Sequence, residues 1–364
     1  MNRTDPKSNA PIMMLSAGNG FIMQSEKYSR DNAGQSLKKY ILLKQGELAY
    51  NHGASKAKQF GCCYELTEPE ARIPYVYHCF KINDHEYTPF IAMALNNAKM
   101  DKQLKRLVSS SVRMDGLLNI SFEDYMSVTL HLPSSTEQKH IADFLKKIDE
   151  RIAAQEKLLA SLKKYKRGLL MHYFSDDKTQ LWTQCSVSQI GKVITGSTPP
   201  TNDRSNYDGD LLFCAPGDVG EQKYISSTEK RVSPKGFALG RPLPPNSVIV
   251  TCIGLIGKLG IAKTSMITNQ QINALVVSEG FDHEFIYYAF ENFFPEYRSK
   301  VSMQTLPILS KSEFEKLMIK VPDLDVQHKI SIHLAAMDRR IEHTQQELNA
   351  LIEHRRGIMQ QLFI

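Results

Sequence analysis

The sequence predicts an α+β protein with an internal pseudo-twofold repeat, in which two similar globular domains alternate with two long helices that pair as a coiled coil. Three observations predict this fold class. Residues 133–174 align without a gap with residues 322–363, each copy carries a narrow apolar stripe, and the regions before the two copies share short matching segments. An internal repeat sets the number of structural units before any single element is assigned. We therefore expect the order domain, helix, domain, helix.

The two copies match at a constant offset of 189 residues, as from Pro133 to Pro322. A proline is tolerated near a helix start, so each copy is expected to open a helix there. The remaining identical pairs include Gln138 and Gln327, Ile141 and Ile330, Asp149 and Asp338, Gly168 and Gly357, and Phe174 and Phe363.

Each copy is expected to be one long helix with a narrow apolar seam. Apolar residues recur at alternating spacings of three and four, which is the heptad pattern of helices that pair in a coiled coil. One polar residue, Gln155 or Thr344, occupies the same heptad of each copy and can fix the register of pairing. A helix that lies on the core of its own domain is the alternative. The predicted seam consists of Ile141, Leu145, Ile148, Ile152, Leu159 and Leu162 in the first copy and Ile330, Leu334, Met337, Ile341, Leu348 and Leu351 in the second.

Composition limits the possible classes of protein. A length of 364 residues suggests two or three domains, and 42% hydrophobic with 23% charged residues is ordinary for a soluble globular protein. No apolar run approaches the roughly 18 residues of a membrane span, and no signal peptide opens the chain, so we expect a cytoplasmic protein without a membrane partner. The six cysteines form no C-x-x-C pair and are expected to be reduced. A net charge of +6 permits an acidic partner such as DNA without requiring one.

The first domain is expected to span residues 1–132 and to mix strands with helices. Short runs rich in β-branched and aromatic residues predict strands at 12–15, 40–43, 47–50 and 75–82. Helical spacing predicts a helix at 90–107, and a short element at 122–132 leads into the first helix segment, 133–176.

The second domain is expected to span residues 177–321, followed by the second helix segment, 322–364. A strand and a short helix are predicted within 182–194, strands at 211–214, 247–253, 260–263 and 272–277, and a helix at 283–293. Two pieces of the domains also correspond: residues 12–19 match 211–218, and 84–87 match 282–285.

At these residues the chain resembles the specificity subunit of a type I restriction-modification system. The likeness is carried by the leader P-x-x-x-x-Q-x-x-I, the heptads and the closing R-G-(L/I)-(L/M)-x-x-x-F of both repeats, by residues 191–199 (GKVITGSTP) and by residues 268–270 (TNQ). The family is built from two target-recognition domains, each followed by a long helix, and the two helices pack antiparallel. The resemblance implies partners: double-stranded DNA, two methyltransferase subunits docked on the helices, and endonuclease subunits through the complex.

The first domain departs from the family pattern. The match of residues 12–19 with 211–218 places Met1 opposite Pro200, so the first domain has no counterpart of residues 181–199. It is therefore expected to lack the opening strand, the short helix and the Gly-Ser-Thr-Pro loop of the family.

Two unlike domains on a rigid rod would read two short DNA sequences at a fixed separation. A helix of about 36 residues spans roughly 54 Å, which bounds the separation at about 16 base pairs. The expected target is bipartite and asymmetric, and lengthening one helix is expected to change the spacer alone.

The candidate DNA contacts are loop residues whose side chains match DNA chemistry. Asn and Gln pair with adenine, Arg pairs with guanine, and Lys more often meets phosphate. The alternative for each is a solvated loop residue, and Asn269 with Gln270 could instead brace a turn. The candidates are Asn51, Lys56, Lys58, Gln59 and Arg113 in the first domain and Ser197, Thr198, Asn202, Arg204, Lys223, Lys258, Gln270, Gln271, Ser302 and Gln304 in the second.

The sequence carries no motif of a catalytic subunit. Residues 198–201 (TPPT) differ from the Asn/Asp-Pro-Pro-Tyr/Phe of an adenine methyltransferase. Residues 254–258 (GLIGK) have the wrong spacing for a phosphate loop, and we interpret them as a tight strand connection. We expect a non-catalytic chain without metal or cofactor, whose partner subunits would hold S-adenosylmethionine, ATP and magnesium.

Three other functions stay open. A stand-alone nuclease would need an acidic metal-binding cluster, which the sequence does not show. An adaptor could use the coiled coil to join two partner-binding modules without DNA. A specificity subunit could also serve a methyltransferase that has no nuclease.

Overall fold

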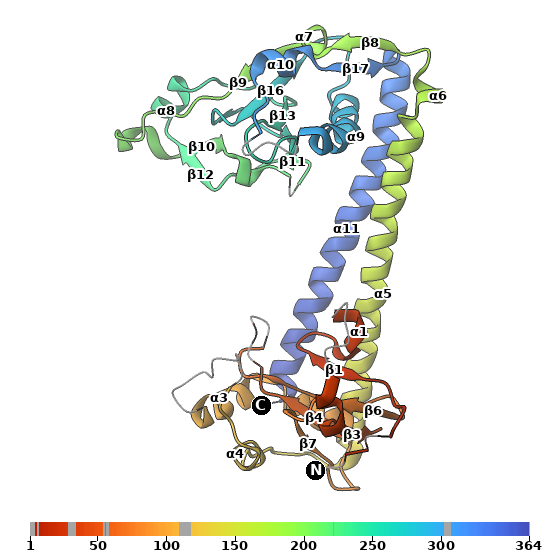
Figure 1. Cartoon of the computed structure of the whole chain (residues 1–364). Helices are drawn as coiled ribbons and strands as arrows, with labels where there is room; N and C mark the ends of the chain where they lie inside the picture. The colour runs from red at the N-terminus through yellow and green to blue at the C-terminus, as the bar shows by residue number, and fades with distance from the viewer. Residues whose placement is uncertain are drawn as a thin grey trace. The chain divides into compact units, whose positions relative to one another are not determined.

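The computed structural model describes residues 4–363 apart from 6, 28–33, 54, 56–57, 109–117, 221 and 302–306. The chain forms two compact units (Figure 1). The first comprises Met1–Glu156 with Glu347–Ile364, and the second comprises Lys157–Gln346. Each unit thus contains one globular part and a segment of both long helices. The boundaries of the units therefore lie within the long helices and differ from those of the four consecutive segments expected from the sequence. Within the described residues, no helix is both long and apolar enough to span a membrane.

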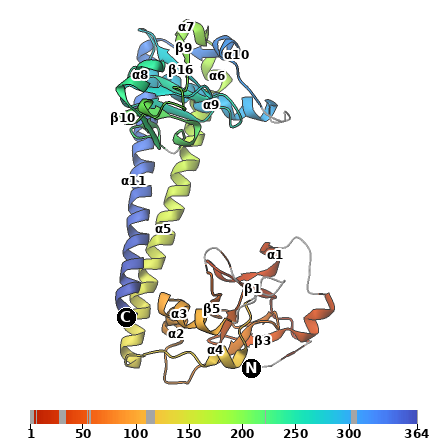
Figure 2. The ribbon, with the colours of Figure 1, turned by 90° about the vertical axis from the view of Figure 1, so that its left-hand side faces the viewer.

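The two long helices, α5 (Ser135–Tyr173) and α11 (Leu324–Leu362), have 39 residues each. In each unit they lie side by side, as both views show (Figures 1 and 2). They run antiparallel, because partner numbers on α11 fall as those on α5 rise. The polar contacts that establish this are Asp149 with Arg355 and Gln155 with Glu347 in the first unit, and Lys166 with Asp338 and Tyr173 with His333 in the second.

All of the predicted seam residues are buried or half-buried, and Leu145 and Leu334 are 0% exposed. The seam also reaches the domain cores. Ile330 and Leu334 belong to the core of the second unit, and Ile141 packs against the core of the first. The stripe therefore serves both as the seam between the two helices and as part of a domain core. The beginning of each helix completes the core of the domain that precedes it.

A glutamine near the start of each long helix ties it to its own domain. Gln138 and Gln327 are 1% and 2% exposed. The Nε2 atom donates to a proline carbonyl oxygen at 2.9 Å in both repeats, Pro133 for Gln138 and Pro322 for Gln327. The Oε1 atom accepts from a backbone N–H, that of Tyr87 at 3.0 Å and that of Asp282 at 2.9 Å. Buried amide groups need such partners, so the repeated glutamine acts as a structural anchor.

This anchor corrects one piece of the sequence alignment. Tyr87 immediately precedes α2 (Thr88–Ala94), and Asp282 immediately precedes α9 (His283–Val301). These two residues therefore correspond, whereas Asp84 lies in a turn ahead of α2. The predicted match of 84–87 with 282–285 is wrong, because four similar residues in a short loop do not determine a structural register.

The second unit contains a five-stranded sheet with the order β11 (Tyr224–Ile225), β14 (Leu259–Ala262), β13 (Val248–Thr251), β16 (Ile272–Val277) and β9 (Gly191–Thr195). Every residue of the central β13 is buried, as its VIVT sequence favours. The smaller sheets are β12 (Lys230–Val232), β10 (Tyr207–Cys214) and β15 (Met266–Thr268), and β17 (Met318–Val321) with β8 (Thr183–Ser186). The shorter helices are α6 (Asp176–Thr179), α7 (Val187–Ile190), α8 (Pro234–Leu239) and α10 (Lys311–Lys316).

The described residues of the first unit form three small sheets. They consist of β1 (Met13–Ser16) with β2 (Gly20–Met23), β3 (Ile41–Lys44) with β6 (Glu70–Ile73), and β5 (Cys62–Glu65), β4 (Leu48–Asn51) and β7 (His78–Phe80). Its helices are α1 (Gln24–Lys27), α2, α3 (Ala98–Leu107) and α4 (Phe122–Met126), and Gly34–Lys39 forms a 3-10 turn.

Most predicted elements lie where the sequence indicated, and two helices differ. The predicted helix 90–107 is broken, because the Asn97 side chain accepts from the N–H groups of Lys99 and Met100 and starts α3 anew. Conversely, α9 continues past the predicted end to Val301 with Pro295 inside it. The predicted strand 75–82 is reduced to β7, because the backbone N–H of Tyr77 donates to the Pro74 carbonyl oxygen and the preceding residues form a turn.

The two units repeat one plan in detail. Before the central strands β4 and β13, Gly46 and Asn246 both adopt a positive φ, of 79° and 66°. In each unit, a strand that pairs with the central strand, β7 or β16, carries a side chain that forms a hydrogen bond with the segment before the last short helix. That helix is α4 in the first unit and α10 in the second. The two bonds are His78 Nε2 to the Ile120 oxygen, 3.0 Å, and Asn273 Nδ2 to the Leu309 oxygen, 3.2 Å.

The first unit is smaller at one edge of its sheet. In the second unit β16 pairs with β9, whereas β7 is the edge strand of the sheet β5-β4-β7 in the described part of the first unit. The described residues also contain no counterpart of β8 and α7 there. This agrees with the prediction that residues 181–199 have no equivalent in the first domain.

Candidate nucleic-acid interface

Three loops of the second unit leave the same end of its five-stranded sheet. Thr195 at the end of β9 lies opposite Asn273, and Thr251 at the end of β13 lies opposite Ile272. Leu259 begins β14 beside Val250. The loops 196–204, 252–258 and 269–271 are therefore neighbours, and they hold most of the DNA contacts predicted for the second domain.

The loops 196–204 and 269–271 are bound to each other. The Ser197 N–H donates to the Thr268 oxygen at 2.8 Å, and the Thr198 hydroxyl donates to Gln270 Oε1 at 2.6 Å. Gly196 permits this approach, because a Cβ there would lie 2.0 Å from the Asn269 oxygen and 2.3 Å from Thr268 Oγ1. The glycine therefore determines how closely the two loops meet.

Asn269 braces the turn that presents Gln270. The Asn269 Oδ1 accepts from the Gln271 N–H at 3.0 Å, and its Nδ2 donates to Gln271 Oε1 at 3.1 Å. The alternative that Asn269 and Gln270 brace a turn thus holds for Asn269, whereas Gln270 contacts Thr198. Gln270 is exposed and Gln271 is half-buried, so Gln270 is better placed to reach a base edge.

The tip of loop 196–204 is held by a cluster of polar contacts. Lys235 Nζ donates to Asp203 Oδ2 at 2.7 Å, and the Ser205 hydroxyl donates to Asp203 Oδ1 at 2.6 Å. These hydrogen bonds, that from Lys235 first, lower the pKa of Asp203 to about 2. Asn202 and Arg204, on either side of Asp203, are exposed. The loop thus presents an amide and a guanidinium group from a braced backbone.

The residues 252–258 form a compact turn between β13 and β14, as predicted for a tight strand connection. Gly254 and Gly257 adopt positive φ values of 73° and 78°. The Gly257 N–H donates to the Thr251 oxygen at 2.8 Å, and the Lys258 N–H donates to Thr251 Oγ1 at 3.0 Å. Lys258 is half-buried at the base of this turn.

Lys223 occupies a different environment from the other candidates. Its side chain is 12% exposed and lies 3.0 Å from Glu284 Oε2. Its Nζ donates to the Tyr288 hydroxyl oxygen at 2.8 Å and sits 4.6 Å from the centroid of that ring. Ion pairing and cation–π contact give Lys223 a structural role. As a DNA contact it stays a prediction, which this inward geometry does not favour.

The first unit presents the corresponding loop, from the end of β4 to the start of β5. The Asn51 Oδ1 accepts from the Gly53 N–H at 3.0 Å, so this amide braces the turn. Lys58 Nζ donates to the Asn96 oxygen at 3.0 Å, and Gln59 is exposed. The predicted contacts Lys56, Arg113, Ser302 and Gln304 lie outside the described residues.

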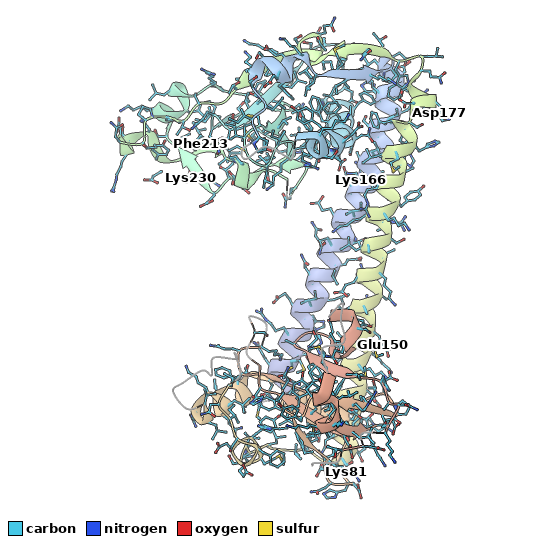
Figure 3. All side chains as sticks on the ribbon, viewed as in Figure 1. Lys81, Glu150, Lys166, Asp177, Phe213 and Lys230 are labelled. Carbon is cyan, nitrogen blue, oxygen red and sulfur yellow. The ribbon has the colours of Figure 1, made fainter. Side chains whose placement is uncertain are left out.

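Two basic residues beside these loops were not predicted. Arg241 is exposed, and its Nη1 donates to the Thr195 oxygen at 2.9 Å. Arg298 is exposed, and its Nη1 donates to the Gly257 oxygen at 3.4 Å. Both are distant in sequence from the loops they contact, so no local pattern could have indicated them. Lys230 projects from β12 of the same unit (Figure 3).

The described loops offer hydrogen-bonding groups and positive charge. Burial raises the pKa of the Cys214 thiol to about 12 and that of Cys252 to about 11, so both are protonated at neutral pH. Among the described residues, no group of three His, Cys, Asp or Glu side chains is arranged to hold a metal ion. Amide, hydroxyl, guanidinium and ammonium groups on loops are the chemistry that reads base edges and phosphates.

The fold and the loop faces define a class of protein with two mixed α+β globular parts, each followed in the chain by one of two antiparallel long helices. Comparison with known families supports the duplication. Residues 43–164 and 180–354 both match the type I restriction modification DNA specificity domain. The chain therefore belongs to the family of type I restriction-modification specificity proteins.

Individual relatives are more distant. The chain is 30% identical over 178 residues to the type I restriction enzyme MjaIX specificity subunit of Methanocaldococcus jannaschii, covering 47% of this chain and 41% of that relative. It is 29% identical over 108 residues to the HindI specificity subunit of Haemophilus influenzae, covering 29% of this chain and 24% of that relative. The chain thus matches less than half the length of these curated relatives.

Two solved structures share the fold over nearly the whole chain. The crystal structure of a type I restriction-modification S subunit from M. genitalium has a TM-score of 0.63 and 15% identity, covering 99% of this chain and 90% of that one. A structure from a study of complex assembly and conformational transition in a type I system has a TM-score of 0.59 and 16% identity, covering 100% and 94%.

Proposed function

We propose that this chain is the non-catalytic DNA-specificity subunit of a type I restriction-modification complex. Each unit reads one half of a bipartite, asymmetric target in double-stranded DNA, and the two long helices set the spacer. The observation that carries the proposal is a loop at the same end of the central strand in both units, β4–β5 in the first and β13–β14 in the second, with unlike residues. Unlike loops on equivalent scaffolds are what two different half-sites require.

Partner subunits supply the chemistry in this proposal. Methyltransferase subunits dock on the long helices and hold S-adenosylmethionine, and endonuclease subunits use ATP and magnesium. Large apolar side chains exposed on the helices support docking, since such residues favour a partner protein. They are Phe144, 51% exposed, Tyr165, 56%, Met171, 71%, and Ile332, 67%.

Methylome mapping of cells that co-express this chain with its methyltransferase subunit tests the proposal. We expect an interrupted motif with two unlike halves. Replacing Asn202 and Arg204 by alanine should relax the sequence specificity of one half of the motif alone. Replacing Lys58 and Gln59 by alanine should relax the specificity of the other half only. Lys192→Ala is the matched control, because this exposed lysine lies at the opposite end of the five-stranded sheet.

Each outcome has a distinct meaning. A symmetric motif would indicate that only one kind of unit reads DNA. Absence of methylation from an assembled complex would contradict the recognition role. Methylation without cleavage in an assay with all subunits would favour the alternative of a specificity subunit that serves a methyltransferase alone.

A further inference from the structure

One large apolar side chain stands in the middle of the polar loop face. Leu255, in the turn between β13 and β14, is 69% exposed, whereas its neighbour Ile256 is 3% exposed and packs into the core. Ile308, on the segment beside this turn, is 53% exposed. Burial of apolar side chains lowers the free energy, and these two remain exposed to water. A pair of such side chains within a binding face therefore indicates a surface that contacts a partner.

The turn holds Leu255 in a fixed position. The Thr251 hydroxyl donates to the Leu255 oxygen and accepts from the Lys258 N–H. A Cβ on Gly257 would lie 2.5 Å from the Phe294 ring, so the turn rests directly on α9. Because the backbone is already ordered, insertion of Leu255 into a partner would require little further loss of entropy.

The segment that carries Ile308 is attached to the same turn. The Gly254 N–H donates to the Pro307 oxygen at 3.0 Å, and Ile253 and Ile308 form an isolated antiparallel bridge. The exposed Arg298 contacts the turn through the Gly257 oxygen, and Lys258 forms its base. Two cationic residues therefore lie at the turn that carries Leu255.

This arrangement is complementary to duplex DNA more than to a protein surface. Cationic groups match phosphates, and an apolar side chain between them matches the stacked faces of two bases. Proteins that insert such a side chain unstack one base step and obtain specificity from how easily that step deforms.

We propose that Leu255, supported by Ile308, inserts at one base step of the half-site read by the second unit and unstacks it. This inference rests on the proposed function and adds a mode of readout to it.

The first unit is built differently at the same place. Gly61 and Gly257 correspond, since both precede the strand that pairs with the central strand and both have a positive φ, 82° and 78°. The sequence between β4 and β5 is longer than that between β13 and β14, and its described residues include the polar Lys58 and Gln59. Asn119 is the counterpart of Ile308 at the offset of the repeat, and it is exposed. Base-step insertion is therefore a property of the second half-site alone.

The test uses the full chain assembled with its methyltransferase subunits and duplexes that contain the target mapped by methylome sequencing. Each duplex carries 2-aminopurine at one position in or beside the second half-site, because its fluorescence rises when the base loses its stacking neighbour. The wild-type complex should raise the fluorescence at one step. Leu255→Ala should abolish the rise and weaken binding roughly 10-fold to 100-fold, the loss expected for one buried leucine contact.

Two further variants make the result specific. Leu255→Met should preserve the fluorescence rise, because methionine keeps the apolar bulk. Leu181→Ala is the matched control, a leucine of the same unit that is 98% exposed and precedes β8.

Two results would overturn the inference. The first is DNA binding by the wild-type complex with no fluorescence rise at any position. The second is DNA binding by Leu255→Ala equal to that of wild type, and if this variant also fails to assemble with the methyltransferase, the pair is a protein contact. A wild-type complex that neither methylates nor binds DNA would instead contradict the proposed function, and the inference with it.

Discussion

The ammonium group of Lys166 on α5 lies 2.6 Å from the carboxylate of Asp338 on α11. The repeat contains the same pair in exchanged form, because Asp149 and Arg355 stand at the equivalent positions and pair through Asp149 Oδ2 and Arg355 Nη2 at 3.0 Å. An acid in the first half of each helix thus meets a base in the second half of the other. This exchange is possible only when the helices run antiparallel, so the pairs help to specify that orientation.

The two pairs are predicted to contribute unequally to stability. Lys166 is 12% exposed and also contacts Glu291 at 2.8 Å, whereas Arg355 and Asp149 are 32% and 43% exposed. Lys166→Met removes the nearest cation from two partly buried carboxylates, with Lys223 left 3.9 Å from Asp338, and should cost about 3 kcal/mol. Arg355→Met should cost less than about 1 kcal/mol. Denaturant unfolding of the full chain measures both, and equal losses would contradict this account.

Lys166 should also make the second unit sensitive to alkaline pH. Burial lowers its pKa, but attraction to Glu291 and Asp338 outweighs burial, so its pKa is raised above the ordinary 10.5. A raised lysine pKa contributes stability that is complete below 10.5 and is lost as the pH rises through the folded value.

Thermal unfolding between pH 8 and pH 12 checks this prediction. Wild type should lose more stability over this range than Lys166→Met, whose curve should be flatter. Burial raises the pKa of Glu291, so its own contribution to stability decreases as the pH rises above its ordinary 4.5. Parallel curves for the two proteins would show that Lys166 is not the group responsible.

The anchoring glutamines should be equivalent and independent. Gln138→Ala and Gln327→Ala each leave a backbone N–H and a proline carbonyl without their partner. Each should cost about 1–3 kcal/mol. Because the two sites lie in separate units, the double variant should show the sum of the single effects. Hydrogen exchange should locate each loss to its own unit, and a loss that spread to both units would argue against independent anchors.

Gly196→Ala should separate the two loops of the second unit. The added methyl group would lie 2.0 Å from the Asn269 oxygen, so the backbone must move and the bond between Thr198 and Gln270 should be lost. We expect DNA binding to weaken at least about 10-fold, while the far-UV circular dichroism is unchanged. Gly18→Ala is the control, because nothing lies within 4 Å of the added atom. Equal binding by both variants would remove loop 196–204 from the interface.

The spacer of the target should follow the length of the helices. One heptad inserted at equivalent central points of α5 and α11 adds about 10 Å, which corresponds to roughly three base pairs. Methylome mapping should then show the same half-sites with a longer spacer. An unchanged spacer would mean that the helices do not set it.

The sequence alone determined the duplication, the long helices and the loops that form the candidate site. A gapless repeat and a heptad pattern depend on local spacing, which the chain carries directly, so α5, α11 and the turn at 252–258 were predictable. Loop positions of Thr198, Asn202, Arg204 and Gln270 followed from turn chemistry in the same way.

Only the tertiary structure decided which side chains meet. Lys223 looks like a loop cation in the sequence, yet its partners Glu284 and Tyr288 come from α9 and turn it inward. Arg298 reaches Gly257 across 41 residues of chain, and the equivalence of Tyr87 with Asp282 depends on two buried glutamines. Such contacts join positions with no shared local pattern, because close packing brings together residues that only the complete fold makes neighbours.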